Sequence, residues 1–175
     1  MNQRIYIDES KARNYLMAAA VLMPSDDKVN RQVLNKLLLP GQRRIHMKQE
    51  RASRRRLILS TLVDTGIIAT IYDAGSGPRT QIIRRKACIE AIVADASRLH
   101  NVHLVFEQDD TLVRSDRECL IECVRAANNR TITYEHRKPS QEVLLGIPDA
   151  LAWAWAKGGD WRRRIEPIVT TVKKV

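Results

Sequence analysis

Apolar runs of strand length alternate with stretches of helical periodicity along most of this chain. Gln3–Asp8 and Asn14–Met23 both have strand character, and so few residues separate them that they must form an antiparallel hairpin. Helical and strand-like segments follow in turn, a pattern typical of strands joined by helical crossovers. The sequence therefore predicts an α/β fold with a mixed sheet, in which an antiparallel hairpin forms one edge, parallel strands follow, and helices cover both faces.

Proline, glycine and asparagine residues mark where the later elements begin and end. The first helix starts at Pro24 and stops before Pro40-Gly41. The other expected elements are helices at 50–64, 79–99, 112–127 and 149–156, a further helical piece at 161–172, and strands at 67–72, 102–106 and 131–136. The helical spacing predicts that Leu57, Ile82 and Ile83 point inward.

Length and composition indicate one ordinary globular domain. A chain of 175 residues is long enough for a real hydrophobic core, and we expect a single domain over 1–175. No apolar run reaches the length of about 18 residues that a membrane span needs, and Arg4 lies inside the first strand, so neither a span nor a signal peptide is expected. A cytoplasmic location is the corresponding expectation. Cys88, Cys119 and Cys123 form no CxxC pair, which argues against disulfides and a zinc ribbon and favours packing.

The charge of the chain favours an anionic partner. Lysine and arginine number 30 against 20 aspartates and glutamates, a formal net charge of +10, and nucleic acid is the commonest partner of so basic a protein. The acids nevertheless crowd together at Glu107-Gln108-Asp109-Asp110. An acidic cluster within a basic chain is what a cation-dependent enzyme acting on a polyanion needs.

Two strands end in carboxylates. Asp8 closes the apolar run Ile5-Tyr6-Ile7, and an ionised group in apolar surroundings must be paired, hydrogen-bonded or bound to a metal. Glu107 ends a later strand, and strand parity directs Glu107 and Asp109 to the same side. If the two strands are neighbours, these carboxylates meet at one edge of the sheet, where Mg²⁺ would be the natural counter-ion. Asp109 or Asp110 could instead cap the next helix, so the choice of ligand stays open.

Two more acids stand at the start of predicted helices. Asp149 is the one acid in Leu144–Ala156, which is apolar on every face and so predicts a buried helix. It could be a fourth ligand of the metal or a first-turn acid that satisfies free backbone donors. Glu50 could likewise be a metal ligand or the partner of Arg54 four residues later.

Four segments form a recognisable combination. They are Tyr6–Ser10, Ile45–Lys48 with Glu50, Leu104–Phe106 with the acids after it, and Ile147–Ala152. Together they resemble an uncharacterised bacterial and phage domain family of the RNase H-like superfamily, whose members open with Tyr-Ile-Asp-Glu-Ser-Gly and close with a Gln-x-Ala-Asp-x-x-Ala helix. Three positions depart from the family pattern. The chain has Lys11 in place of glycine, Gly146 in place of glutamine and Pro148 in place of alanine.

The resemblance implies a nuclease that hydrolyses phosphodiesters with two Mg²⁺ or Mn²⁺ ions. It places acids on the first strand, an early helix, the fourth strand and the last helix. In this sequence these acids are Asp8, Glu50, Glu107 or Asp109, and Asp149. The residues expected to contact the nucleic-acid backbone are His46, Lys48, Arg51, Arg54, Arg55 and Arg56.

Two other functions fit the same sequence. A nucleic-acid-binding module that kept the fold and lost the chemistry would have the same charge. A partner-binding protein could instead use Trp153, Trp155 and Trp161 as an interface, although such residues also complete cores. Cleavage that depends on a divalent cation distinguishes the nuclease from both.

Overall fold

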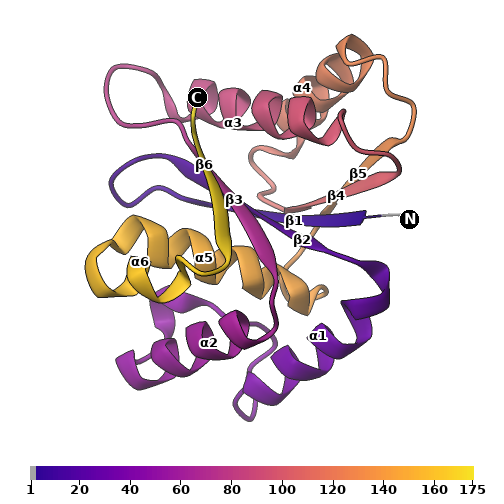
Figure 1. Cartoon of the computed structure of the whole chain (residues 1–175). Coiled ribbons are helices and arrows are strands. Elements are labelled where there is room, and N and C mark those ends of the chain that lie inside the picture. The colour runs from indigo at the N-terminus through magenta and orange to yellow at the C-terminus, as the bar shows by residue number, and fades with distance from the viewer. Residues whose placement is uncertain (1–2) are drawn as a thin grey trace.

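A computed structural model describes residues 3–175 and contains one mixed sheet with helices on both sides (Figure 1). The strands are β1 (Gln3–Ser10), β2 (Leu16–Leu22), β3 (Ile68–Asp73), β4 (Val102–Glu107), β5 (Ile132–Arg137) and β6 (Val169–Lys174). Their order across the sheet is β5-β4-β1-β2-β3-β6. The predicted α/β fold with an antiparallel hairpin and parallel strands is confirmed.

The antiparallel strand lies inside the sheet and not at its edge as expected. β2 is antiparallel to both β1 and β3, whereas the pairs β1–β4, β4–β5 and β3–β6 are parallel. The reason is visible in β2 itself, where the side chains of Leu16–Ala20 are all buried. A strand that is apolar on both faces gains most from an interior position with neighbours on both edges.

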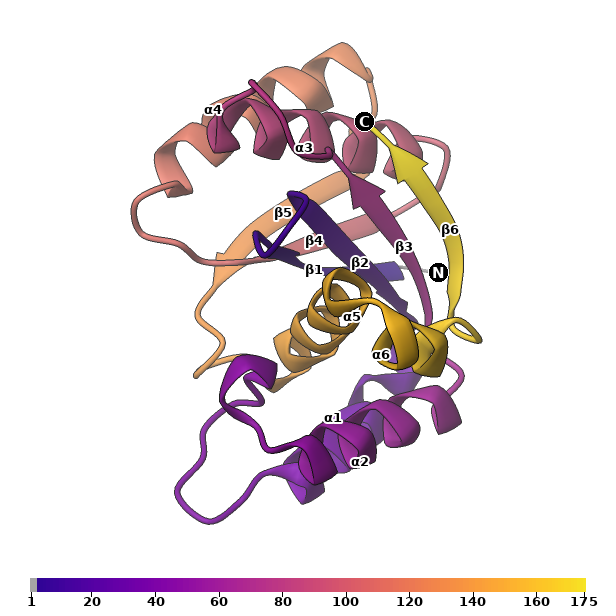
Figure 2. The ribbon, with the colours of Figure 1, turned by 90° about the vertical axis from the view of Figure 1, so that its left-hand side faces the viewer.

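The helices form layers above and below the sheet. Their bounds are α1 (Pro24–Leu37), α2 (Ala52–Asp64), α3 (Gln81–Ala96), α4 (Val113–Ala126), α5 (Gly146–Lys157) and α6 (Gly159–Ile165), with 3₁₀ turns η1 (Met47–Gln49) and η2 (Val143–Leu145). α3 and α4 cover one face, α5 lies directly against the other, and α1 and α2 pack beneath α5 (Figure 2). The prediction of helices on both faces is confirmed.

The position of α5 explains its sequence. Because it lies between the sheet and the outer helices, Ala150, Leu151 and Ala152 are all fully buried although successive helical steps point them in different directions around the helix. On β1 the side chains alternate between the two cores. Tyr6 faces the α5 side, and Ile5 and Ile7 face the α3/α4 side.

The end of the chain differs from the expected helical piece at 161–172. α6 stops at Ile165, and Val169–Lys174 forms β6, which pairs with the free edge of β3. Two threonines and two valines in this segment suit a strand, because β-branched side chains favour extended backbone.

Three predicted core residues are exposed. Leu57, Ile82 and Ile83 are each about half accessible to solvent. Ile82 and Ile83 lie in the first turn of α3, and its buried stripe starts only at Arg85 and Cys88. In α2 the buried stripe runs through Ile58, Leu59 and Leu62, so Leu57 faces outward.

Within residues 3–175, none of the helices combines the length and the apolar character needed to cross a bilayer.

Candidate carboxylate site

Four carboxylates line one cavity of about 680 Å³, and three of them come from three different elements. Asp8 lies near the end of β1 and Glu107 is the last residue of β4, while Asp149 lies in the first turn of α5. The parallel register pairs Ile7 with Phe106, so Asp8 and Glu107 are the next residues along adjacent strands. We call Asp8, Glu107 and Asp149 the carboxylate cluster.

Burial and mutual repulsion make ionisation of Asp8 and Glu107 costly. The pKa of Asp8 is raised well above its usual value, first by burial and then by the negative charges of Glu107, Glu9 and Asp149. The backbone N–H of Glu9 donates to Asp8 Oδ1 at 2.7 Å and acts in the opposite direction. Burial also raises the pKa of Glu107, and the charge of Asp149 adds to this shift, while a hydrogen bond with Asp8 and the charge of Arg44 at 3.5 Å oppose it. A bound cation would relieve the repulsion.

Asp149 holds a neighbouring segment and not the start of its own helix. Its Oδ2 accepts a hydrogen bond from the backbone N–H of Met47 at 2.8 Å, and its Oδ1 lies 3.3 Å from His46 Nδ1. The first-turn acid considered above would have satisfied donors of α5 itself. Through this contact, Asp149 fixes η1 and keeps the His46 ring at the wall of the cavity.

The donor set fits a hard divalent cation. The carboxylate cluster offers only oxygen atoms, which Mg²⁺ and Mn²⁺ prefer. Among residues 3–175, the cluster does not bring one oxygen from each of its three acids within 4.8 Å of the others. A single ion bound by all three would therefore require the side chains to move closer together.

Two of the expected acidic residues lie elsewhere. Glu50 is buried, accepts a hydrogen bond from Gln42 Nε2 at 3.0 Å and pairs with Arg54 Nε at 3.3 Å. Asp109 accepts from the backbone N–H of Thr111 at 2.9 Å and from its hydroxyl at 2.6 Å, and these bonds lower the pKa of Asp109. Neither carboxylate lines the cavity. Glu50 thus makes the pairing with Arg54 that the sequence left open, and Asp109 belongs to the turn before α4.

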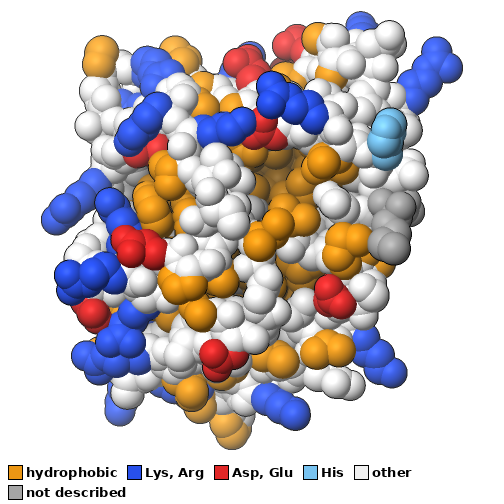
Figure 3. All heavy atoms as spheres, in the orientation of Figure 1, with side chains coloured by type: hydrophobic (Ala, Val, Ile, Leu, Met, Phe, Trp, Pro, Cys, Tyr) orange, Lys and Arg blue, Asp and Glu red, His pale blue; other side chains and the backbone are white. Residues whose placement is uncertain are grey.

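Basic side chains surround the carboxylate cluster. The members that line the cavity, here called the basic rim, are Lys11, Arg13, Lys48, Arg55 and Lys157. Of the other expected backbone-contacting residues, His46 lines the cavity, whereas Arg51, Arg54 and Arg56 do not. Lysine and arginine side chains are also frequent on the left-hand side of Figure 3, where Figure 1 places α6, the start of α2 and the β1–β2 turn.

Arg55 is held in place more firmly than the rim lysines. Its guanidinium lies 4.5 Å from the ring centre of Trp153, and it donates to the backbone carbonyl groups of Met47 and Lys48 at 2.8 and 3.0 Å. Trp153 follows Asp149 by four residues and so shares its face of α5, which is why it also lines the cavity. The four-residue spacing between Asp149 and Trp153, and so their shared helical face, could be read from the sequence alone.

A buried ion-pair network on the other side of β1 was not expected. Arg85 donates two hydrogen bonds to Asp116, each of 2.7 Å, and one to Glu9 at 2.8 Å. His136 Nε2 lies 3.1 Å from the same Asp116 carboxylate. Because Glu9 lines the cavity, this network connects the site with α3, α4 and β5. The signal in the sequence was an arginine three residues before Cys88, on the apolar stripe of α3.

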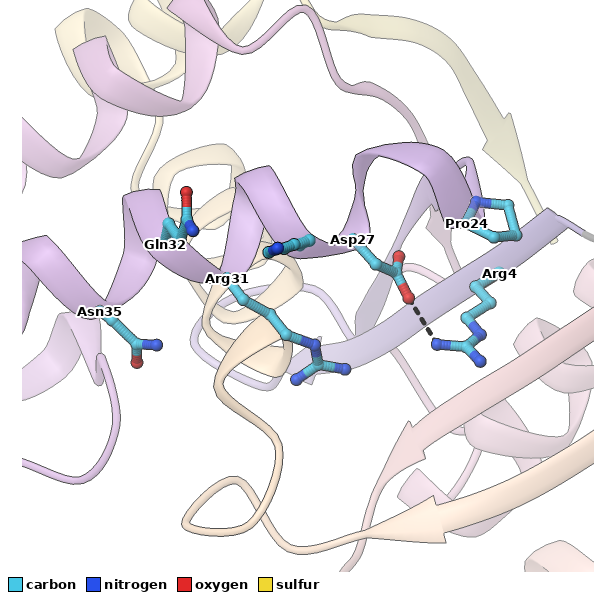
Figure 4. A pocket seen from close by; sticks show the side chains of 7 residues that line it. Arg4, Pro24, Asp27, Arg31, Gln32 and Asn35 are labelled. Carbon is cyan, nitrogen blue, oxygen red and sulfur yellow. Dashed lines mark hydrogen bonds and ion pairs between the residues drawn. The ribbon is translucent and has the colours of Figure 1, made fainter.

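A second, shallower cavity of about 440 Å³ lies over α1 and has a different character (Figure 4). The Arg4 guanidinium reaches across from β1 to the Asp27 carboxylate at 2.5 Å. Arg31, on the same wall, pairs with Glu142. The two arginines that line this cavity, Arg4 and Arg31, are thus already neutralised by carboxylates of the chain.

No family model matches this chain, and a search of curated proteins gives no match.

Proposed function

We propose that this protein is a nuclease on an RNase H-like fold, and that it hydrolyses nucleic-acid phosphodiesters with divalent cations. The observation that carries the proposal is the convergence of Asp8, Glu107 and Asp149, which are far apart in the sequence, on one cavity surrounded by the basic rim. The mixed sheet, with its order β5-β4-β1-β2-β3-β6, is compatible with an RNase H-like arrangement.

The carboxylate cluster would hold Mg²⁺ or Mn²⁺, as a pair of ions, through oxygen atoms alone. When bound, such a pair activates water and stabilises the leaving oxygen of a phosphodiester. Burial of Asp8 excludes water from one side of the cluster and so strengthens its attraction for a cation.

Other groups around the cavity would act on the substrate. Lys48 and Lys157 are exposed on the basic rim, where their charges can pair with phosphate groups without reading base sequence. Arg55, fixed against Trp153, would give a more rigid contact to a phosphate. His46 is oriented by Asp149 and can accept or release a proton at the ring nitrogen that faces away from this carboxylate.

The direct test is cleavage of labelled single-stranded and duplex DNA, RNA and DNA–RNA hybrids in the presence of Mg²⁺ or Mn²⁺, with EDTA as the blank. We expect Asp8→Asn, Glu107→Gln and Asp149→Asn each to lower the cleavage rate by about 10²-fold or more, as loss of a major catalytic group does. Asp109→Asn and Glu50→Gln are matched controls, since both carboxylates lie outside the cavity, and they should retain most of the rate.

Two outcomes would reject the proposal. Cleavage that survives Asp8→Asn would place the reaction elsewhere or attribute it to a contaminant. Binding of nucleic acid with no cleavage in either metal would favour the inactive binding module, which the basic rim supports without any role for the acids.

A further inference from the structure

α3 and α4 bring together a second group of metal-binding side chains, in a different layer of the molecule from the carboxylate cluster. Cys119 and Cys123 are four residues apart on α4 and therefore share one helical face, with their Sγ atoms 3.8 Å apart. α3 lies beside α4 (Figure 1), and Glu90 belongs to α3. One ligand atom from each of the three residues lies within 4.8 Å of the other two.

The spacing of the two sulfur atoms is the one that tetrahedral zinc requires. With Zn–S bonds of about 2.3 Å and tetrahedral angles, two thiolates on one ion are separated by about 3.8 Å. Cys119 and Cys123 have this separation. The Glu90 carboxylate is on an exposed side chain, so it can shorten its distance to the sulfur atoms by changing rotamer.

The donor types select the class of cation. Thiolate sulfur favours zinc and similar thiophilic ions over Mg²⁺ or Ca²⁺, which prefer oxygen. Two sulfurs and one carboxylate leave the fourth tetrahedral position to water. The distance between the sulfurs also shows free cysteines and not a disulfide.

The thiols are poorly suited to act as nucleophiles. Burial raises the pKa of Cys119 to about 12 and also raises the pKa of Cys123, so neither is a thiolate at neutral pH in the absence of a cation. A structural role, joining α3 to α4, fits this pair better than covalent chemistry. We propose that Glu90, Cys119 and Cys123 form a binding site for Zn²⁺ or a similar thiophilic cation that clamps α3 to α4.

Co²⁺ and Cd²⁺ are suitable probes because sulfur ligation gives each of them a ligand-to-metal charge-transfer band in the ultraviolet. We expect the full chain, kept reduced, to show this band and to bind one ion per molecule at the site. At a Zn²⁺ concentration about 100 times the Kd, the melting temperature should rise by about 5 °C or more.

Single substitutions distinguish cation binding at this site from cation binding elsewhere in the molecule. Cys123→Ser changes a partly exposed residue, and it should weaken Cd²⁺ binding by at least about tenfold and reduce the charge-transfer band. Glu90→Gln should weaken Cd²⁺ binding without removing the band. Glu118→Gln is the matched control, because Glu118 is an exposed acid on α4 that pairs with Arg114. Asp8→Asn should also leave the band unchanged, since the carboxylate cluster has no sulfur.

The proposal fails if the native protein gives no charge-transfer band with either ion. It also fails if the band keeps its intensity in the double variant Cys119→Ser/Cys123→Ser, because Cys88 would then be the ligand. A folded Cys123→Ser protein that binds Cd²⁺ as tightly as the native chain would likewise overturn it.

Discussion

Asp8 is surrounded by other acids and shielded from water, so its ionisation opposes folding. The substitution Asp8→Asn keeps the oxygen that accepts the Glu9 N–H and removes the charge. We expect it to raise stability at pH 7 by about 1 kcal/mol, or the melting temperature by about 2–4 °C, while it lowers the rate of the proposed cleavage by about 10²-fold or more. Thermal unfolding in EDTA measures the first effect without interference from bound cations.

The same residue makes stability depend on pH in a defined direction. Because the pKa of Asp8 is raised in the folded state, the folded chain binds more protons than the unfolded chain between the two pKa values. The contribution of protonated Asp8 to the free energy of unfolding is therefore complete below the pKa that Asp8 has in the unfolded chain. It is lost as the pH rises through the raised pKa of the folded chain. The difference in melting temperature between Asp8→Asn and the native protein should vanish near pH 4. A difference that grows toward low pH would contradict the raised pKa.

The sequence indicated Asp8 and Asp149 as candidate site residues because each is an acid at the border of an apolar segment. An ionised group in such a position must be paired, hydrogen-bonded or bound to a metal. Glu107 followed from its place at the end of a strand. Glu50 and Asp109 could not be separated from these by the same argument. Their partners, Gln42 and Thr111 among them, depend on how a loop and a turn fold back on themselves.

Arg85 and Asp116 join α3 to α4 through a buried ion pair. Arg85→Met should cost about 3–5 kcal/mol because it leaves Asp116 charged and buried without its main partner. In the double variant Arg85→Met/Asp116→Leu, part of this loss should be recovered, with a coupling energy of about 1–3 kcal/mol. Urea unfolding of the native chain, both single variants and the double variant measures the coupling.

The exposed pair Arg114 and Glu118 on α4 is the control for this cycle. Both side chains are largely accessible to solvent, so their coupling should not exceed about 0.5 kcal/mol. A coupling between Arg85 and Asp116 as small as that of the control would mean that the buried network adds little to stability.

The elements that the sequence predicted well are those with a strong period and clear caps. α1 begins at Pro24 and α2 ends just before Gly66, as their cap residues indicated. β6 was missed because a short run of threonine and valine beside an arginine-rich helix has no period of its own, and only the free edge of β3 decides its structure. The central place of β2 was missed for a related reason, since strand order depends on contacts between distant segments.

The net charge of +10 on the chain should make binding to nucleic acid strongly dependent on salt. Affinity measured in EDTA should fall linearly on a double logarithmic plot against salt concentration. The double variant Lys48→Gln/Lys157→Gln should reduce the slope by about 0.9 for each duplex phosphate contact that is lost. Lys36→Gln/Lys86→Gln removes the same charge from α1 and α3, outside the cavity, and should alter the slope much less.

The carboxylate cluster takes its members from opposite ends of the chain, with Asp8 on β1 and Asp149 on α5. During translation β1 leaves the ribosome before α5. A fragment that ends before α5 therefore lacks one of the three acids, whatever the rest of it folds into. Under the proposed nuclease function, such a fragment should not cleave nucleic acid.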